Sequence, residues 1–504
     1  MKTLFRLSIS FMKNVMMFLL LITSGIATAQ KPQVTFDEPQ EEPANWRKTP
    51  LHNATNLNIL NWDDNEIIIS SFKEQLYLAR IDKNLNIKES SKTRLGESRA
   101  REDEILRIWH ENDSIYIIMK EEHNVLFYTF DYKSLQQTNM KQIYTISKHD
   151  PSQTATPVDI AWSDNGEYIA LVVRHIPRNS EEFMGMRRKQ SSFHEFRLYD
   201  KHFNPIGSGV FDAVVLPHRI GTGYGYASSW TLTDNGEIVF VSLKAARNPA
   251  DYPDFGATAT QMEIGLFKDG EMTTSTIPNV YRGNLPVGAV NCTEDINSYE
   301  NRNSFSMSLR TGTILRYDGK SMMIFFLNTL YKYSFEDNTV TPQVAMPYAL
   351  EPTYYSSGLS NVIGDNEGGQ IIRGIGGFVW IPQDISKSFI GTWNVNRSSS
   401  TKWSVSSTTA IRNLTFLRNN RLYHFADMEK STTSYFIIGI AEGTEKLAPQ
   451  ITCVGKDGKS ETFNLDAVGY TYFYKISDNR IALWERNIKV NGKECMRFGH
   501  VDLP

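Results

Sequence analysis

Twelve residues in the long connecting segments of this chain have side chains suited to molecular recognition. Arginine and histidine can bind carboxylates, and tyrosine and phenylalanine can pack on sugars, peptides and protein surfaces. The twelve are Arg187, Arg188, His218, Arg219, Tyr252, Phe255, Tyr281, Arg282, Tyr299, Arg302, Tyr354 and Tyr355. Two alternatives stay open: the basic pair at 187–188 is a solvated loop, and Tyr252 and Phe255 pack within their own loop.

No spacing in the chain assigns a catalytic residue. We find no Ser/His/Asp order, nucleophile elbow or carboxylate pair, and the ten histidines lack the spacing of metal ligands. Gly221, Gly223 and Gly225 imitate a phosphate-binding loop, but the pattern predicts no helix after them. We therefore expect no metal and no cofactor, and the catalytic residues of any enzymatic activity are unknown.

Two interleaved series of turn residues indicate which elements carry these side chains. Asn, Asp and Gly tolerate the positive φ of tight hairpins, so each match predicts a turn between two strands. The first series is centred on Asn65, Asn112, Asn165, Asn235, Gly319, Asn366, Asn419 and Asn479. The second is centred on Asp82, Asp131, Asp200, Asp269, Asp337, Asn396, Gly443 and Asp502. The alternation predicts eight copies of a four-stranded unit, which is typical of a β-propeller.

The segments AWSDNGEYIALVV and LTDNGEIVFVSL, around Asn165 and Asn235, carry the clearest repeat. They resemble the strand–turn–strand core of TolB-like and WD-repeat propellers. The resemblance implies a propeller architecture and supplies no function. Trp62, Trp109 and Trp162 each lie three residues before their turn Asn, which predicts that they occupy the same side of their strands.

The sequence therefore predicts an all-β chain with a single propeller of eight four-stranded blades over 56–504; seven blades is the alternative. Short continuous apolar runs such as EIIIS and YIALVV predict strands buried on both faces. The eighth unit has no fourth strand of its own. We expect Gln33-Val34-Thr35-Phe36, in the polar lead-in over 30–55, to pair with its last strand and close the ring.

Residues 1–29 have the features of a secretory signal: Lys2, Arg6 and Lys13, an apolar run, and an A-x-A site before Gln30. Its removal takes the formal charge from −3 to about −6, which disfavours a nucleic-acid partner. We expect no membrane span in the mature chain, and three cysteines are too few for a disulfide scaffold. The expected location is the periplasm, the cell surface or outside the cell, as a monomer or within a cell-envelope complex.

The spacing between the two series locates the insertions. It is 17 residues in the first unit but 35, 34 and 30 in the third, fourth and sixth. Antiparallel topology puts these insertions, and the long connections after the fourth and fifth units, on one face of the disc. Loops on a rigid scaffold commonly bind ligands. We therefore expect a non-catalytic binding or scaffold protein for a protein, peptide or glycan. The alternative is a propeller enzyme of glycoside hydrolase or lyase type, with its site at the central channel.

Overall fold

The computed structural model confirms the all-β expectation. It describes residues 31–504 except 53–56, 64–65, 73–74, 96–103, 148–153, 157, 178–191, 214, 217–224, 227, 246–258, 279–312, 327–328, 346–361, 365–366, 374–376, 393–399, 402–403 and 437–438. Within these residues the helical segments are two short 3-10 turns, η1 (Ala44–Lys48) and η6 (Ile385–Lys387).

Eight antiparallel sheets of four or more strands account for most of the described chain, and we number them in chain order. Sheet 1 contains β3 (Leu57–Trp62), β4 (Glu66–Phe72), β5 (Leu76–Asp82) and β6 (Ile87–Thr93). Sheet 2 contains β7 (Glu104–Glu111), β8 (Ser114–Glu121), β9 (Asn124–Asp131) and β10 (Gln137–Thr145). Sheet 3 contains β12 (Val158–Trp162), β13 (Tyr168–Pro177), β14 (Ser192–Asp200) and β15 (Pro205–Ala213), with the short β11 (Thr154–Ala155) beside β13. Sheet 4 contains β18 (Ser228–Leu232), β19 (Ile238–Ala245), β20 (Ala259–Lys268) and β21 (Glu271–Pro278).

The second half of the chain continues the pattern. Sheet 5 contains β22 (Thr313–Tyr317), β23 (Ser321–Phe326), β24 (Thr329–Ser334) and β25 (Thr339–Ala345). Sheet 6 contains β26 (Val362–Gly364), β27 (Gln370–Arg373), β28 (Gly377–Ile381) and β29 (Phe389–Thr392). Sheet 7 contains β30 (Ser400–Thr401), β31 (Ser404–Arg418), β32 (Arg421–Phe436), β33 (Gly439–Lys446), β34 (Gln450–Gly455) and β35 (Ser460–Asn464). Sheet 8 contains β36 (Tyr470–Lys475), β37 (Arg480–Val490), β38 (Lys493–Asp502), β1 (Gln33–Phe36) and β2 (Gln40–Glu41); β16 (Val215–Leu216) and β17 (Gly225–Tyr226) form a separate pair.

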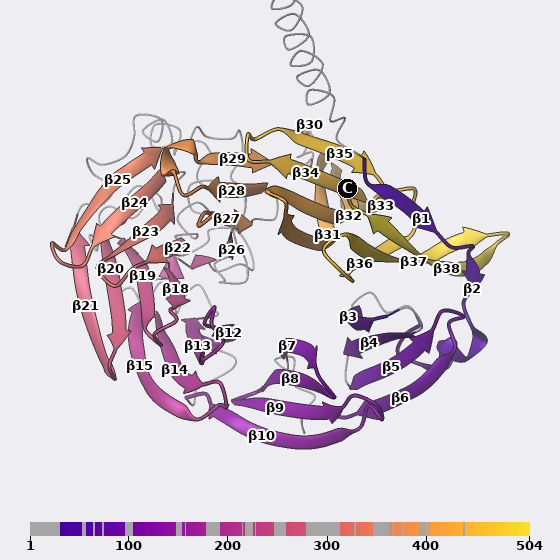
Figure 1. Ribbon diagram of the computed structural model, residues 1–504, viewed down its shortest axis with the longest axis horizontal. Helices are drawn as coiled ribbons and strands as arrows, with labels where there is room; N and C mark the ends of the chain where they lie inside the picture. Colours follow the sequence, from indigo (N-terminus) through magenta and orange to yellow (C-terminus); the bar gives the residue numbers. More distant parts are fainter. Residues whose placement is uncertain are drawn as a thin grey trace, which may run out of the picture.

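The sheets stand around a central opening with their first strands innermost, which is the arrangement of a β-propeller (Figure 1). The core lies between neighbouring sheets. In β4, Ile67 and Ile69 pack towards sheet 8, while Ile68 packs towards sheet 2. Successive side chains of a strand point to opposite faces, so a continuous apolar run satisfies both neighbours. This confirms the expectation of strands buried on both faces.

The first series of turn centres falls between the first and second strands of seven sheets and between β31 and β32 in sheet 7. Asn65 and Asn366 themselves lie outside the described residues. The tryptophan prediction is wrong for one residue. Trp109 packs with Trp162 across the interface of sheets 2 and 3, so these two side chains face opposite ways along the ring. Because the turns differ in length, residues at the same distance from the turn Asn do not always point to the same face of their strand.

The second series is correct in sheets 1 to 5 and wrong in sheets 6, 7 and 8. In sheet 8, Asp502 is the last residue of β38 and pairs with Gln33 and Arg480, so it lies in a strand and not in a turn. Gly443 lies within strand β33, and the turn between β34 and β35 runs through Gly458, whose φ is +77°. In sheet 6 the chain passes from β28 to β29 through η6, and the expected centre Asn396 lies outside the described residues. Asp384 begins this turn, and its side chain accepts a hydrogen bond from the Ser386 backbone N–H.

The segment Gln33–Phe36 pairs antiparallel with β38, with Val34 opposite Val501. Beyond it, Trp46 of η1 is fully buried between sheets 8 and 1, and its indole N–H donates to the Leu85 carbonyl at 2.9 Å. The segment over 30–55, which the sequence predicts to be a polar lead-in with a closing strand, therefore also supplies a buried tryptophan at the interface of sheets 8 and 1.

Candidate functional site

All twelve residues predicted to bind a ligand lie outside the described part of the chain. The structure does describe the strands from which their connections leave. These connections join β13 to β14, β16 to β17, β19 to β20, β21 to β22 and β25 to β26. Apart from the separate β16–β17 pair, each leaves from the end of its sheet opposite the paired turns. We call this end the long-loop face and the other the turn face.

One expected insertion is wrong, and another was missed. Only positions 374–376 separate β27 from β28, because the apparent length of the sixth insertion came from placing its second turn at Asn396. Sheet 7 is extended instead. Its strands β31 and β32 have 15 and 16 residues, and β33 pairs with the end of β32 on the side of the long-loop face. Sheet 7 therefore adds a strand extension to that face.

A buried polar cluster lies at the base of the connection between β13 and β14. Asp159 and Arg174 form an ion pair, and the carboxylate also lies 3.5 Å from the Trp230 indole nitrogen. His175 Nε2 lies 2.8 Å from Glu195 Oε2, and its ring stacks on Phe193. The two pairs occupy opposite faces of sheet 3, because adjacent residues of a strand point to opposite sides. The first pair joins β12 to β13, and the second joins β13 to β14 where the connection leaves.

Burial sets the protonation of this cluster. It lowers the pKa of His194 to about 3, assisted by the positive charge of Arg174, so the imidazole is neutral at physiological pH. Burial also raises the pKa of Glu195, partly offset by a hydrogen bond from the Ser147 backbone and by the charge of Arg197. The cluster therefore positions the strands from which the connection leaves.

A second cluster holds the base of the sheet 7 extension. Asp427 of β32 is fully buried, and it receives Arg412 Nη1 at 2.9 Å and an ion pair from Lys446 of β33. Burial raises the pKa of the Asp427 carboxyl, and the charges of Lys446 and Arg412 oppose that rise. The Arg412 guanidinium also lies 4.4 Å from the centre of the Tyr472 ring in sheet 8. The extension is thus tied to both sheets.

A third buried carboxylate holds the connection between sheets 7 and 8. Glu485 Oε1 accepts the backbone N–H groups of Val468 and Gly469, both at 2.6 Å. Its other oxygen accepts Arg497 Nε at 2.6 Å. Arg497 in turn stacks on Phe36 of β1, 4.0 Å from the ring centre. One residue therefore links β36, β37 and β38 to the N-terminal strand.

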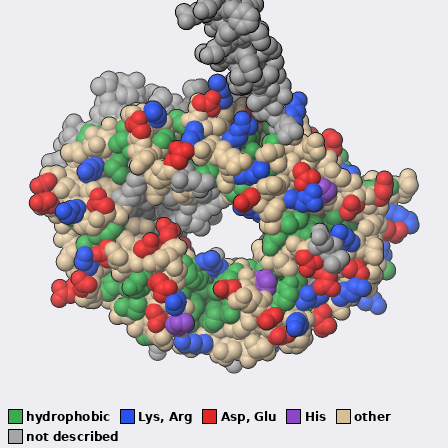
Figure 2. Space-filling view, viewed as in Figure 1, with side chains coloured by type: hydrophobic (Ala, Val, Ile, Leu, Met, Phe, Trp, Pro, Cys, Tyr) green, Lys and Arg blue, Asp and Glu red, His purple; other side chains and the backbone are tan. Residues whose placement is uncertain are grey.

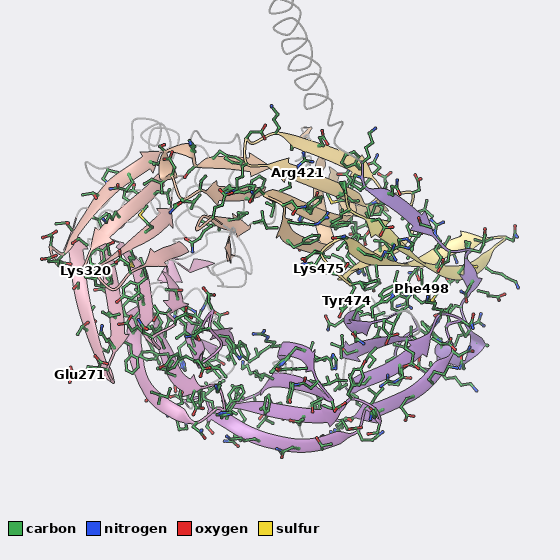
Figure 3. The ribbon with its side chains drawn as sticks, in the orientation of Figure 1. Glu271, Lys320, Arg421, Tyr474, Lys475 and Phe498 are labelled. Carbon is green, nitrogen blue, oxygen red and sulfur yellow. The ribbon has the colours of Figure 1, made fainter. Side chains whose placement is uncertain are left out.

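The centre of the disc is open in the space-filling view (Figure 2). Tyr474 and Lys475 of β36 lie at its margin, whereas Glu271 and Lys320 lie on the outside of the ring (Figure 3). Tyr474 lies 3.5 Å from the Leu60 carbonyl of β3, so it spans the inner edge of sheets 8 and 1. The channel margin thus carries an aromatic and a basic group from β36.

Two further properties concern the described residues alone. No group of three or more His, Cys, Asp or Glu side chains among them is arranged to hold a metal ion. The same residues include no helix with the length and hydropathy of a membrane span.

No protein-family model and no curated protein sequence matches the chain. It is similar to solved structures at low identity. The Dos1 propeller is 8% identical with a TM-score of 0.34, over 68% of this chain and 73% of that one. Apo AztD from Citrobacter koseri is 10% identical with a TM-score of 0.32, over 82% and 96%. The N-terminal domain of Nup159 is 10% identical with a TM-score of 0.30, over 86% and 96%. At these scores the likenesses add nothing to the architecture given by the strands themselves.

Proposed function

We propose that the chain is an exported, non-catalytic binding or scaffold propeller that recognises a protein, peptide or glycan through its long-loop face. One observation carries the proposal: the long connections of sheets 3, 4 and 5 and the extension of sheet 7 all leave from the same end of their sheets. Among the described residues, the connections on the turn face are short hairpins and the η6 turn between β28 and β29. A scaffold with no binding role has no need for such an asymmetry.

The proposal includes one closed ring of eight blades. The eight sheets and the pairing of β1 with β38 support it, because that pairing joins the two ends of the chain within one sheet. A ring closed in this way is rigid, and a rigid ring holds its loops in fixed relative positions.

The test is a pair of loop deletions, 181–192 and 249–258, compared with the full chain on glycan and peptide arrays. We expect each deletion to reduce ligand capture while the melting temperature stays nearly unchanged. Lys201→Ala and Lys459→Ala change turns on the opposite face and serve as matched controls. Capture that survives both deletions would overturn the proposal, and so would deletions that unfold the protein.

Export has its own test. We expect the protein recovered from the cell envelope or medium to begin at Gln30, as N-terminal sequencing would show. A mature protein recovered from the cytoplasm with residues 1–29 intact would contradict this part of the proposal.

A further inference from the structure

The outermost strand of a sheet has one backbone edge that its own sheet does not use. Such an edge can pair with a strand of another chain, and proteins usually prevent this with charged residues or proline on the edge strand. Four outermost strands of this ring follow that rule, because β6, β10 and β35 carry exposed charged residues and β25 has a proline in its interior. These residues are Lys88, Glu89, Lys92, Lys141, Glu461 and Pro342.

The outermost strand of sheet 3, β15, is different. It lies on the outside of the ring (Figure 1), and its sequence from Ile206 to Phe211 contains neither a charged residue nor a proline. Ile206 and Val210 are instead 51% and 55% exposed. A neutral edge strand with exposed β-branched side chains is a template for pairing with another strand.

The part of β15 that suits a partner strand runs from Gly207 to Ala213. This segment pairs with β14 in an unbroken register, whereas a β-bulge at Ile206 shifts the register before it. A bulge bends its strand and increases the local twist, so it limits pairing at that end. The midpoint of the regular segment is Val210.

The packing of two aromatic rings against this segment explains its glycines. A Cβ atom at Gly209 would lie 2.6 Å from Phe196 Cζ, and one at Gly207 would lie 2.5 Å from Phe267 Cζ in sheet 4. Both rings are buried in the core, so a side chain at either position would displace one of them. Val210 alternates with these glycines and therefore points to the other face of the strand, where it is exposed.

We propose that β15 pairs antiparallel with β15 of a second copy of this chain, about a two-fold axis at Val210. A two-fold interface must be complementary to itself. This register places Val210 against its own copy and removes both side chains from water. Asp212 falls opposite Ser208 of the partner subunit, so no like charge lies directly opposite it. Gly209 falls opposite Phe211 of the partner subunit, so two bulky side chains do not meet on that face.

The dimer goes beyond the proposed function, because it uses the outer rim of the ring and not the long-loop face. It also gives hydrogen-bond partners to backbone N–H and C=O groups on the outer edge of β15, as in other cases of strand addition. One strand pair makes a small interface. We therefore expect a reversible dimer whose fraction rises with protein concentration.

Sedimentation velocity over a range of protein concentrations tests whether this dimer forms. Val210→Lys places two like charges directly opposite each other and should raise the dissociation constant of the dimer at least about tenfold. Met140→Lys adds the same charge at a side chain that is 51% exposed on the outermost strand of sheet 2, so it should dimerise like the wild type. The melting temperature of each variant shows that it is folded.

Single cysteine substitutions test the register. Opposite residues of an antiparallel pair have Cα atoms about 4.5–5.5 Å apart, a distance that a disulfide can span. Val210→Cys should therefore form an interchain disulfide under mild oxidation. Ser208→Cys should not, because its two copies would lie roughly 13 Å apart along the strands. The oxidised wild type is the control for the native cysteines.

A protein that stays monomeric at every concentration would overturn the proposal, and so would a dimer that Val210→Lys leaves intact. A disulfide in Ser208→Cys but not in Val210→Cys would also contradict it, because the strands would then pair in another register. The 249–258 deletion should dimerise like the full chain, so failure of the loop-face proposal is distinguishable from failure of this one.

Discussion

Replacing Trp46 by alanine tests whether the N-terminal segment is a structural part of the ring. The indole is fully buried between sheets 8 and 1. It meets Trp484 edge to face, with ring centres 6.1 Å apart, and donates to the Leu85 carbonyl at 2.9 Å. Trp46→Ala therefore removes an aromatic contact, a buried volume and a hydrogen bond at once.

The parts of this change can be separated. Truncating a buried tryptophan to alanine costs about 3–5 kcal/mol, including the cavity left behind. Leaving a buried carbonyl without its donor adds about 1–3 kcal/mol. We therefore expect Trp46→Ala to lower the free energy of unfolding by roughly 4–8 kcal/mol. Trp46→Phe keeps most of the ring and loses the N–H donor, so it should cost about 1–3 kcal/mol.

The assay is equilibrium urea unfolding followed by circular dichroism. Met140→Ala is the control, because that side chain is 51% exposed and its loss should change stability by less than about 0.5 kcal/mol. A Trp46→Ala midpoint equal to that of the control would refute the reasoning. So would a Trp46→Phe variant as unstable as Trp46→Ala, since the hydrogen bond would then account for the whole effect.

Three further predictions concern the pairing of β1 with β38, the buried Glu485 carboxylate and the turn at Asp82. Deleting 31–38 removes β1 and the Phe36–Arg497 contact, so we expect a loss of several kcal/mol in urea unfolding; an unchanged midpoint would mean that the strand is dispensable. Glu485→Gln leaves Arg497 without its buried carboxylate and should lower the free energy of unfolding by about 2–4 kcal/mol. Asp502→Asn breaks the exposed pair with Arg480 and should lower it by less than about 1 kcal/mol. Equal losses in the two variants would contradict the role of burial. Burial opposes ionisation of Asp82, but hydrogen bonds from Asn86, Lys88 and Asn84 lower its pKa from 3.8 to about 2. The ionised carboxylate therefore stabilises the fold fully above about pH 4, and this stabilisation disappears as the pH falls towards 2. The difference in unfolding free energy between wild type and Asp82→Asn should shrink over that pH range, and a constant difference would contradict the prediction.

The repeat was predictable because turn chemistry is local. Asn112, Asn419 and Gly319 adopt positive φ, as their residue types indicate. In the second turns of sheets 1 to 3, the positive φ falls on residue types that do not normally indicate it. Positive φ falls there on Leu85, Leu135 and Phe203, each buried. Burial of the side chain, worth about 1.5–3 kcal/mol, exceeds the cost of the strained backbone, about 1–2 kcal/mol.

The errors came from features that only tertiary structure decides. Gly443 and Asn396 fit a turn pattern, but the strand extension of sheet 7 and the η6 turn of sheet 6 place the real turns elsewhere. Trp46 lies in a polar segment with no periodicity, so its burial against sheet 8 has no local signal. The twelve predicted ligand-binding residues stay a prediction.

The pairing of Val34 with Val501 also imposes an order on folding. The closing strand β1 precedes all other described strands in the chain, and its partner β38 follows all of them. Sheets 1 to 7 consist of strands that are close in sequence, so they can form during synthesis. The pairing of β1 with β38 can form only after β38 has been synthesised. Contacts so distant along the chain form slowly. Until then β1 and the apolar face of sheet 1 lack the partners that sheet 8 provides.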